Sequence, residues 1–134
     1  MIKLSDYKIY WGDLHSHCAI SYGEGSLENA IKRASQQLDF CSITGHAFWP
    51  DIDMLSNDKK DIKNYHLKGF IKLKKNWLKI LKKLKLFEKK YHIKIFPSYE
   101  WHNLKYGDHN IYGNDFNFLR IFCQFFFNLI NPFI

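Results

Sequence analysis

A stretch of about thirty residues, from Ile62 to Tyr91, repeats apolar side chains at steps of three and four positions. This spacing gathers the apolar side chains on one side of an α-helix and leaves the lysines of the stretch on the opposite side. The apolar positions are Phe70, Leu73, Trp77, Ile80, Leu81, Leu84 and Phe87. We therefore expect a long helix that covers a sheet, with a helix lying on a membrane surface as the alternative.

The charge of the chain is concentrated in the same stretch. The formal net charge is +7, and the segment from Lys68 to Lys94 holds eleven lysines and one acidic residue. The remaining residues hold nine basic and twelve acidic side chains, a balance of −3. We interpret the basic segment as a solvated helix face, with nucleic-acid binding through residues 68–94 as an alternative. We expect neither a stable nucleic-acid partner nor a membrane partner.

Short apolar runs alternate with helical patterns along the chain. The segments Lys8–Leu14, Asp39–Thr44 and Ile93–Tyr99 each predict a short strand. Ser26 is a typical N-cap residue for a helix that runs to about Gln37. Strands that alternate with helices in this way indicate an α/β fold with a parallel sheet or a barrel.

Three further segments complete the chain. Ala47 to about Lys60 is rich in Asp, Asn and Ser and predicts a loop, while Gly107–Gly113 predicts a fourth short strand or a turn. The tail FNFLRIFCQFFFNLINPFI is strongly aromatic, but polar residues interrupt it too often for a membrane span. We expect one domain over residues 1–115. Residues 116–134 are interpreted as a truncation or frameshift product, or alternatively as a core helix of a larger domain.

The three cysteines, Cys18, Cys41 and Cys123, are widely spaced and form no C-x-x-C pair. They predict neither a disulfide framework nor a zinc site of the cysteine type. The opening residues, MIKLSDYKIYWGD, lack the apolar stretch of a secretion signal. The sequence therefore predicts a cytoplasmic protein.

Histidines and one carboxylate stand at the ends of the predicted strands. His15 and His17 lie two positions apart, so on a strand both side chains point to the same face. His46 and Glu100 follow the second and third predicted strands. The carboxyl ends of the strands of a parallel barrel converge on one rim. The sequence therefore predicts a site there for Zn, Mn or Fe, metals that imidazole and carboxylate ligands suit.

The residues around these positions resemble a known family. The stretch YWGDLHSHCAISYGEGSLENAIKRASQQLDFCSITGHA resembles the opening of the PHP (polymerase and histidinol phosphatase) superfamily, in the branch that begins with W-G-D-L-H-x-H. The later segments PSYEWH and YGDHNIYG resemble the E-W and G-x-H-N segments of that branch. The resemblance covers about Tyr10 to Gly113. It implies the N-terminal part of a distorted seven-stranded β/α barrel, incomplete in this chain, that holds up to three metal ions.

The resemblance also implies a role for individual residues. His15 and His17 resemble the pair that binds the first metal, and Glu100 resembles the carboxylate that bridges the first and second metals. His109 resembles a ligand of the second metal, and His46 resembles a ligand of the third. Glu100 is therefore the predicted catalytic residue as well as a predicted ligand.

Two more residues near the motifs are candidates for supporting roles. Asp13 either orients a metal ligand by a hydrogen bond without binding the metal itself, or caps the local backbone. His102 follows Glu100 by two positions and shares its face, so it is a secondary candidate. His66 and His92 lie on or beside the long helix and are predicted to be surface residues.

The chain departs from the family pattern at the third metal and after His109. Gly45 stands where the family usually has Asp, and Tyr22 stands where many members carry an acid or a histidine. The family's later ligands, a histidine and an Asp-x-His pair, have no counterpart after His109.

The reaction that the resemblance implies is the hydrolysis of a phosphate ester by metal-activated water. The expected substrate is a small-molecule or nucleotide phosphate ester. This chain is expected to lack activity by itself if the later ligands are essential. A metal-binding remnant without catalysis is the alternative.

Overall fold

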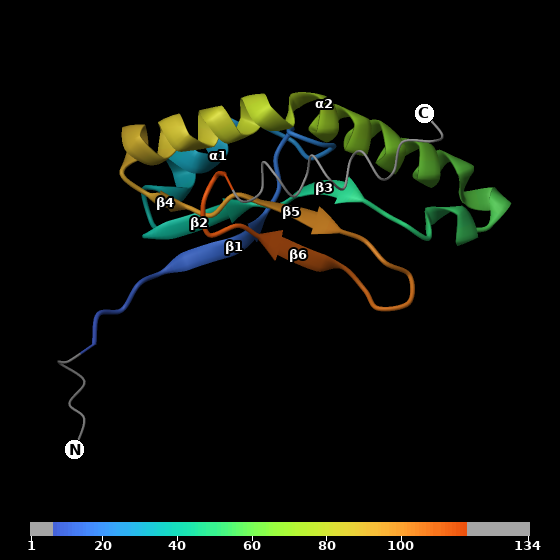
Figure 1. The fold of residues 1–134 in the computed structure, drawn as a ribbon, viewed down its shortest axis with the longest axis horizontal. Coiled ribbons are helices and arrows are strands. Elements are labelled where there is room, and N and C mark those ends of the chain that lie inside the picture. Colours follow the sequence, from blue (N-terminus) through green and yellow to red (C-terminus); the bar gives the residue numbers. More distant parts are fainter. Residues whose placement is uncertain (1–6, 118–134) are drawn as a thin grey trace, which may run out of the picture.

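The computed structural model describes residues 7–117 as a mixed α/β structure. Its elements are β1 (Gly12–Ser16), α1 (Leu27–Ala34), β2 (Phe40–Ile43), β3 (Gly45–Phe48), the 3₁₀ helices η2 (Ile52–Met54) and η3 (Asn57–Lys59), α2 (Lys60–Tyr91), β4 (Lys94–Ile95), β5 (Ser98–Trp101) and β6 (His109–Tyr112). Both α-helices lie on one side of the strands, and α2 runs along the length of the strand layer (Figure 1). The α/β prediction is therefore confirmed, while the seven-stranded barrel stays a prediction.

The strands form two three-stranded sheets whose strands are interleaved along the chain, since β3 of the second sheet precedes β4 of the first. The first sheet has the order β1-β2-β4, and all its neighbours are parallel. The second has the order β3-β5-β6, in which β3 and β5 are parallel and β5 and β6 are antiparallel. Thr44 alone separates β2 from β3, and Phe96 and Pro97 separate β4 from β5. The second sheet thus continues the central strand β2 and the edge strand β4 of the first sheet, as β3 and β5, beyond a break in each.

The last strand returns to the first. The Tyr112 hydroxyl of β6 donates to the Leu14 carbonyl of β1 over 2.8 Å, and the Asn110 side chain contacts Nδ1 of His15. The strand layer therefore curves enough to bring its two outer strands together, as Figure 1 shows for β1 and β6. This curvature assembles the site described below.

The core lies between α2, α1 and the strands. Leu73, Trp77 and Leu84 of α2 are buried against Ile43 of β2 and Ile95 of β4 in one apolar cluster. Burying a side chain of this size contributes about 1.5–3 kcal/mol, so this face of α2 holds the helix on the strands. The long amphipathic helix is confirmed, and its predicted start at Ile62 is two residues late.

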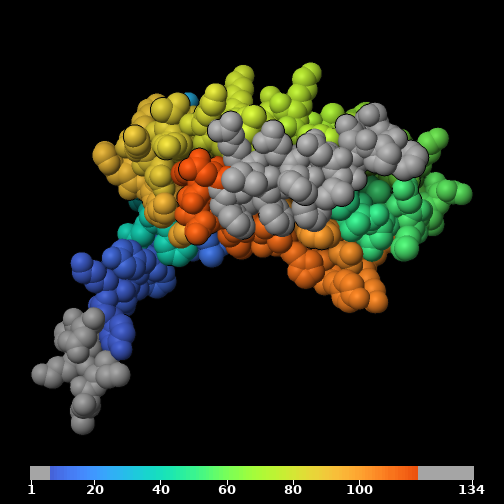
Figure 2. All heavy atoms as spheres, viewed as in Figure 1, coloured from blue at the N-terminus to red at the C-terminus, as the bar shows by residue number. Residues whose placement is uncertain are grey.

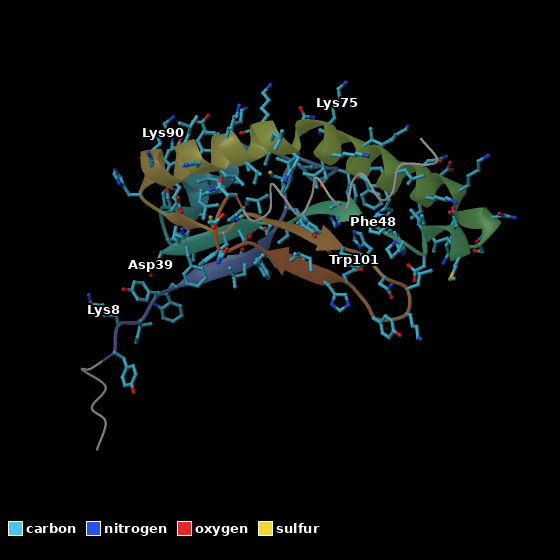
Figure 3. All side chains as sticks on the ribbon, viewed as in Figure 1. Lys8, Asp39, Phe48, Lys75, Lys90 and Trp101 are labelled. Carbon is cyan, nitrogen blue, oxygen red and sulfur yellow. The ribbon has the colours of Figure 1, made fainter. Side chains whose placement is uncertain are left out.

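The lysines of α2 lie on its outer side, as predicted. Lys75 and Lys90 point away from the strands (Figure 3), and side chains of α2 project from the upper edge of the molecule (Figure 2). Lys90 pairs with Glu28 of α1 over 2.6 Å at the exposed surface. Such surface pairs contribute little to stability, so the basic face is mainly solvated surface.

Several boundaries differ from the sequence predictions. The first strand begins at Gly12 and not at Lys8, because its register with β2 starts at the Gly12–Phe40 pair, at the first residue of β2. Ser26 caps α1 as predicted, with its Oγ accepting from the Asn29 amide over 3.1 Å, but the helix ends at Ala34. The predicted third strand is two strands, since Pro97 has no N–H to donate to a ladder.

The region predicted as a loop from Ala47 to Lys60 contains the end of β3 and two 3₁₀ helices. The predicted fourth strand exists as β6, but it runs antiparallel to its neighbour, so the second sheet is mixed. Of the tail, residues 118–134 lie outside the described residues, and so does Cys123.

Cys18 and Cys41 are free and buried, and burial raises the pKa of both thiols, that of Cys41 to about 12. Across residues 7–117, no helix is both long enough and apolar enough to cross a membrane.

Candidate metal centre

A buried carboxylate occupies the centre of the site. Glu100 lies on β5, between β3 and β6, and only 4% of its surface is exposed. Burial raises the pKa of its carboxyl group, because a charged carboxylate loses its hydration there. Its Oε2 atom is buried and has no hydrogen-bond partner among residues 7–117. A carboxylate oxygen in this situation is costly unless a positive charge lies beside it.

Imidazole nitrogens surround this oxygen. Glu100 Oε2 lies 3.4 Å from Nε2 of His17 and 3.1 Å from Nδ1 of His46, although neither contact has hydrogen-bond geometry. Two groups of potential metal ligands share the carboxylate, and the ligand atoms of each group lie within 4.8 Å of one another. The first triad is His15, His17 and Glu100, and the second triad is His46, Glu100 and His102.

The first triad is the more exposed of the two. Nε2 of His15 and Nε2 of His17 lie 3.0 Å apart, so both rings present a nitrogen to the same point, as the H-x-H spacing predicted. Asp13 accepts hydrogen bonds from the His15 amide over 2.9 Å and from the Ser16 hydroxyl over 2.6 Å. Asp13 therefore supports the backbone of the H-x-H segment through the His15 amide and the Ser16 hydroxyl.

The second triad is buried. Nδ1 of His46 lies 2.7 Å from Nε2 of His102, and Nδ1 of His102 lies 2.9 Å from the Asp108 carboxylate. Burial, and then the neighbouring His17 and His102, lower the pKa of His46 to about 3. His46 is consequently a neutral imidazole at neutral pH, which is the form that binds a metal ion. Asp108 orients His102 in the way that carboxylates commonly orient histidine ligands.

Sheet register explains why these residues meet. His46 of β3 pairs directly with Glu100 of β5, and neighbours in a register point to the same face. His102 follows Glu100 by two positions and keeps this face just beyond the end of β5. Phe48 and Trp101, labelled in Figure 3, mark the ends of the two strands on this side of the molecule. The secondary candidate His102 therefore lies in the site for the same reason as His46, because both residues share the face of Glu100.

His109 lies elsewhere. It pairs with Trp101 in the β5–β6 register, one position away from the Glu100–Asn110 pair, so its side chain belongs to the opposite face. His109 is exposed and belongs to neither triad, whereas the next residue, Asn110, contacts His15. The structure therefore brings together His15, His17, His46, Glu100 and His102, and it leaves His109 outside.

Two residues beside the second triad were not among the predicted site residues, although the family resemblance had placed Tyr22 near the third metal. The Tyr22 ring stacks on His46 with centroids 4.0 Å apart, and its hydroxyl lies 2.8 Å from Nδ1 of His66. His66 is half-buried, not a simple surface residue as predicted. A further signal in the sequence is Gly69, a glycine within a long helix, where a packing reason is expected.

A cavity of about 570 Å³ opens beside the first triad. His17 and Ser16 form part of one wall, and Glu24, Asn29 and Arg33 contribute polar groups from the segment around α1. A small ligand that reaches the first triad therefore has room next to it.

The donor set fits divalent transition ions. Imidazole nitrogens and a carboxylate bind Zn, Mn or Fe, and an uncompensated buried carboxylate oxygen is the kind of group that a cation satisfies. Glu100 faces both imidazole pairs, so one carboxylate could serve two ions. The sequence matches no model of a known protein family, and it matches none of the curated proteins with which it was compared. The site is therefore interpreted from its own chemistry.

Proposed function

We propose that this chain carries the metal centre of a PHP-type hydrolase, and that the reaction is the hydrolysis of a phosphate ester. The observation that carries the proposal is the buried Glu100 carboxylate, whose Oε2 has no hydrogen-bond partner in the described part of the chain and faces His17 and His46. The resemblance of the H-x-H, E-W and G-x-H-N segments to the PHP superfamily supports the choice of reaction.

Each residue of the site would have a distinct task. Divalent cations bound there would act as Lewis acids and activate water for attack on phosphorus. Glu100 would hold two cations close together because its carboxylate faces both triads. His46 keeps its lone pair available at neutral pH, since burial lowers its pKa. Asp108 orients His102 and thereby fixes which of its nitrogens faces the site.

The predicted seven-stranded barrel belongs to this proposal as well. Parallel strands with helices on one side, and a strand layer that curves until β6 contacts β1, are compatible with part of such a barrel. Ligands from later strands of the family would complete the site in a longer protein. The expected substrate remains a small-molecule or nucleotide phosphate ester.

The test is the metal content of the purified full chain. We expect wild type, loaded with Zn or Mn and then desalted, to retain at least one ion per chain, and His15→Ala/His17→Ala to lose ions from the first triad. His92→Asn is the matched control, because His92 is exposed, lies in neither triad and has a left-handed backbone that Asn tolerates. Equal metal content in wild type and the double variant would refute the proposed first triad.

Activity is tested separately on a panel of phosphate monoesters and diesters. Metal-dependent turnover that Glu100→Gln abolishes would support the hydrolase. Stoichiometric metal without turnover would instead favour the alternative, a metal-binding remnant without catalysis. Nucleic-acid binding through the lysine face of α2 has a different signature, an affinity that falls steeply with salt and does not depend on metal.

A further inference from the structure

Tyr22 stands over the second triad and has no task in the proposed function. Its ring is parallel to that of His46, with an interplanar angle of 12° and centroids 4.0 Å apart. The Tyr22 hydroxyl lies 3.4 Å from Nε2 of His102, a potential ligand atom of the second triad. The phenol therefore reaches the place where the imidazoles of the second triad converge.

The position of Tyr22 is specifically accommodated by α2. Gly69 is buried in the middle of this helix, and any Cβ there would overlap the Tyr22 ring. Glycine is unfavourable in a helix interior, so its presence fits a need for space at this point. The Tyr65 hydroxyl also donates to the Tyr22 carbonyl over 3.0 Å. On α2, Gly69 thus leaves space for the Tyr22 ring against His46, and Tyr65 holds the Tyr22 backbone.

The hydrogen atoms around the hydroxyl can be assigned from their partners. His102 Nδ1 faces the Asp108 carboxylate, which accepts only, so the hydrogen of the neutral ring lies on Nδ1 and Nε2 carries a lone pair. Without a cation, that lone pair accepts from Nδ1–H of His46 over 2.7 Å, and the Tyr22 hydroxyl, at 3.4 Å, is a second and longer donor to it. His66 Nδ1, 2.8 Å from the hydroxyl oxygen on its other side, can donate to it.

A cation in the second triad changes this arrangement. It would occupy the lone pair of His102 Nε2, and the Tyr22 hydroxyl would lose that acceptor. A tyrosine hydroxyl keeps its hydrogen at neutral pH, because its ordinary pKa is about 10. A half-buried donor without an acceptor is unfavourable, and an oxygen of a bound ligand would restore the hydrogen bond.

From this geometry we infer that Tyr22 is an oxyanion-binding residue: with His66 donating to its oxygen, its hydroxyl donates to an oxygen of a phosphate group at the second triad. This inference rests on the proposed metal centre. It adds a recognition group for the phosphoryl part of the substrate. It also gives Tyr22 a function at a position where the family pattern has an acid or a histidine.

The experiment compares wild type with Tyr22→Phe as the full chain, both loaded with Mn. Phenylalanine keeps the ring that stacks on His46 and removes only the hydroxyl. Metal content is measured first, and the Kd of inorganic phosphate is then measured by isothermal titration calorimetry. We expect equal metal content and a Kd for phosphate about tenfold higher in the variant, as for loss of one hydrogen bond to a charged group.

Tyr91→Phe is the matched control, because it also removes a hydrogen-bonded hydroxyl, the one that donates to Glu28 over 2.8 Å at the other end of α2. Its phosphate Kd should equal that of wild type. If wild type and Tyr22→Phe retain metal and bind phosphate equally well, the inference is wrong and the metal centre stands. If wild type retains metal but binds no phosphate, the assigned ligand class is wrong. If wild type retains no metal, the proposed metal centre fails and the inference fails with it.

Discussion

Replacing Glu100 with Gln should make the metal-free protein more stable and the metal-loaded protein less stable. Gln has the same shape as Glu, so the packing around β5 is preserved. The change removes a negative charge that is 4% exposed and supplies an amide N–H in its place. With the charge gone, the buried side chain no longer carries the free-energy cost of an ion that has lost its hydration.

The magnitude follows from the unsatisfied oxygen. Leaving a buried polar group without its partner costs about 1–3 kcal/mol, so Glu100→Gln should raise the free energy of unfolding by about this amount in EDTA. For a chain of this size each kcal/mol corresponds to a rise of roughly 3–5 °C in Tm. With metal bound, wild type should be more stable than Glu100→Gln. An ion at a thousand times its Kd stabilises wild type by about 4.1 kcal/mol, and the variant lacks this stabilisation.

The dependence on pH provides an internal check. Burial raises the pKa of Glu100 in the folded state, so its destabilising effect is absent below the unfolded pKa, grows as the pH rises above it, and is complete above the folded pKa. The difference between variant and wild type in EDTA should therefore narrow in acid and widen toward neutral pH. The difference narrows in acid because a protonated Glu100 and a Gln side chain are both uncharged and have nearly the same shape.

The assay is urea unfolding followed by tryptophan fluorescence, in EDTA and in saturating Mn. A variant less stable than wild type in EDTA at pH 7 would refute this reasoning. Such a result would mean that the neighbouring histidines already stabilise the carboxylate as imidazolium ions, and that no cation is needed. Equal stabilisation of both proteins by Mn would refute the role of Glu100 as a metal ligand.

Three further predictions concern other residues. The metal-free protein should lose up to about 2 kcal/mol of stability between pH 7 and pH 5 through His46, whose pKa falls from 6.5 to about 3 on folding, and urea unfolding of His46→Asn should show a correspondingly smaller loss. Gly69→Ala should cost roughly 1 kcal/mol net, since overlap with the Tyr22 ring outweighs the better helix propensity of Ala; a stabilised variant would contradict the packing argument. His109→Ala should keep the metal content of wild type, because His109 lies on the face opposite Glu100. A lower metal content in this variant, measured by elemental analysis, would show that His109 is a metal ligand after all.

The local elements of this protein are largely contained in its sequence. The apolar spacing of α2, the N-cap at Ser26 and the run of β2 are short-range patterns, and the structure confirms each of them. The strand features that the sequence predicted wrongly depend on a single interrupting residue or on pairing with another strand. Pro97 divides a run that looks like one strand, and β6 takes its antiparallel direction from pairing with β5.

In the candidate site, too, local patterns were predictable from the sequence, and contacts between distant segments were not. The H-x-H spacing placed His15 and His17 on one face, and both nitrogens do meet, because alternation along a strand is a local property. Whether His109 or its neighbour Asn110 faces Glu100 depends on a register shift of one residue between strands, which no local pattern determines.

Tyr22 and His66 are forty-four positions apart, and their contact depends on how α2 lies across the strands. The sequence by itself therefore determined the two α-helices, the run of β2 and the H-x-H pair. Only the tertiary structure decided which other side chains surround Glu100, because those contacts depend on sheet register and helix packing between distant segments.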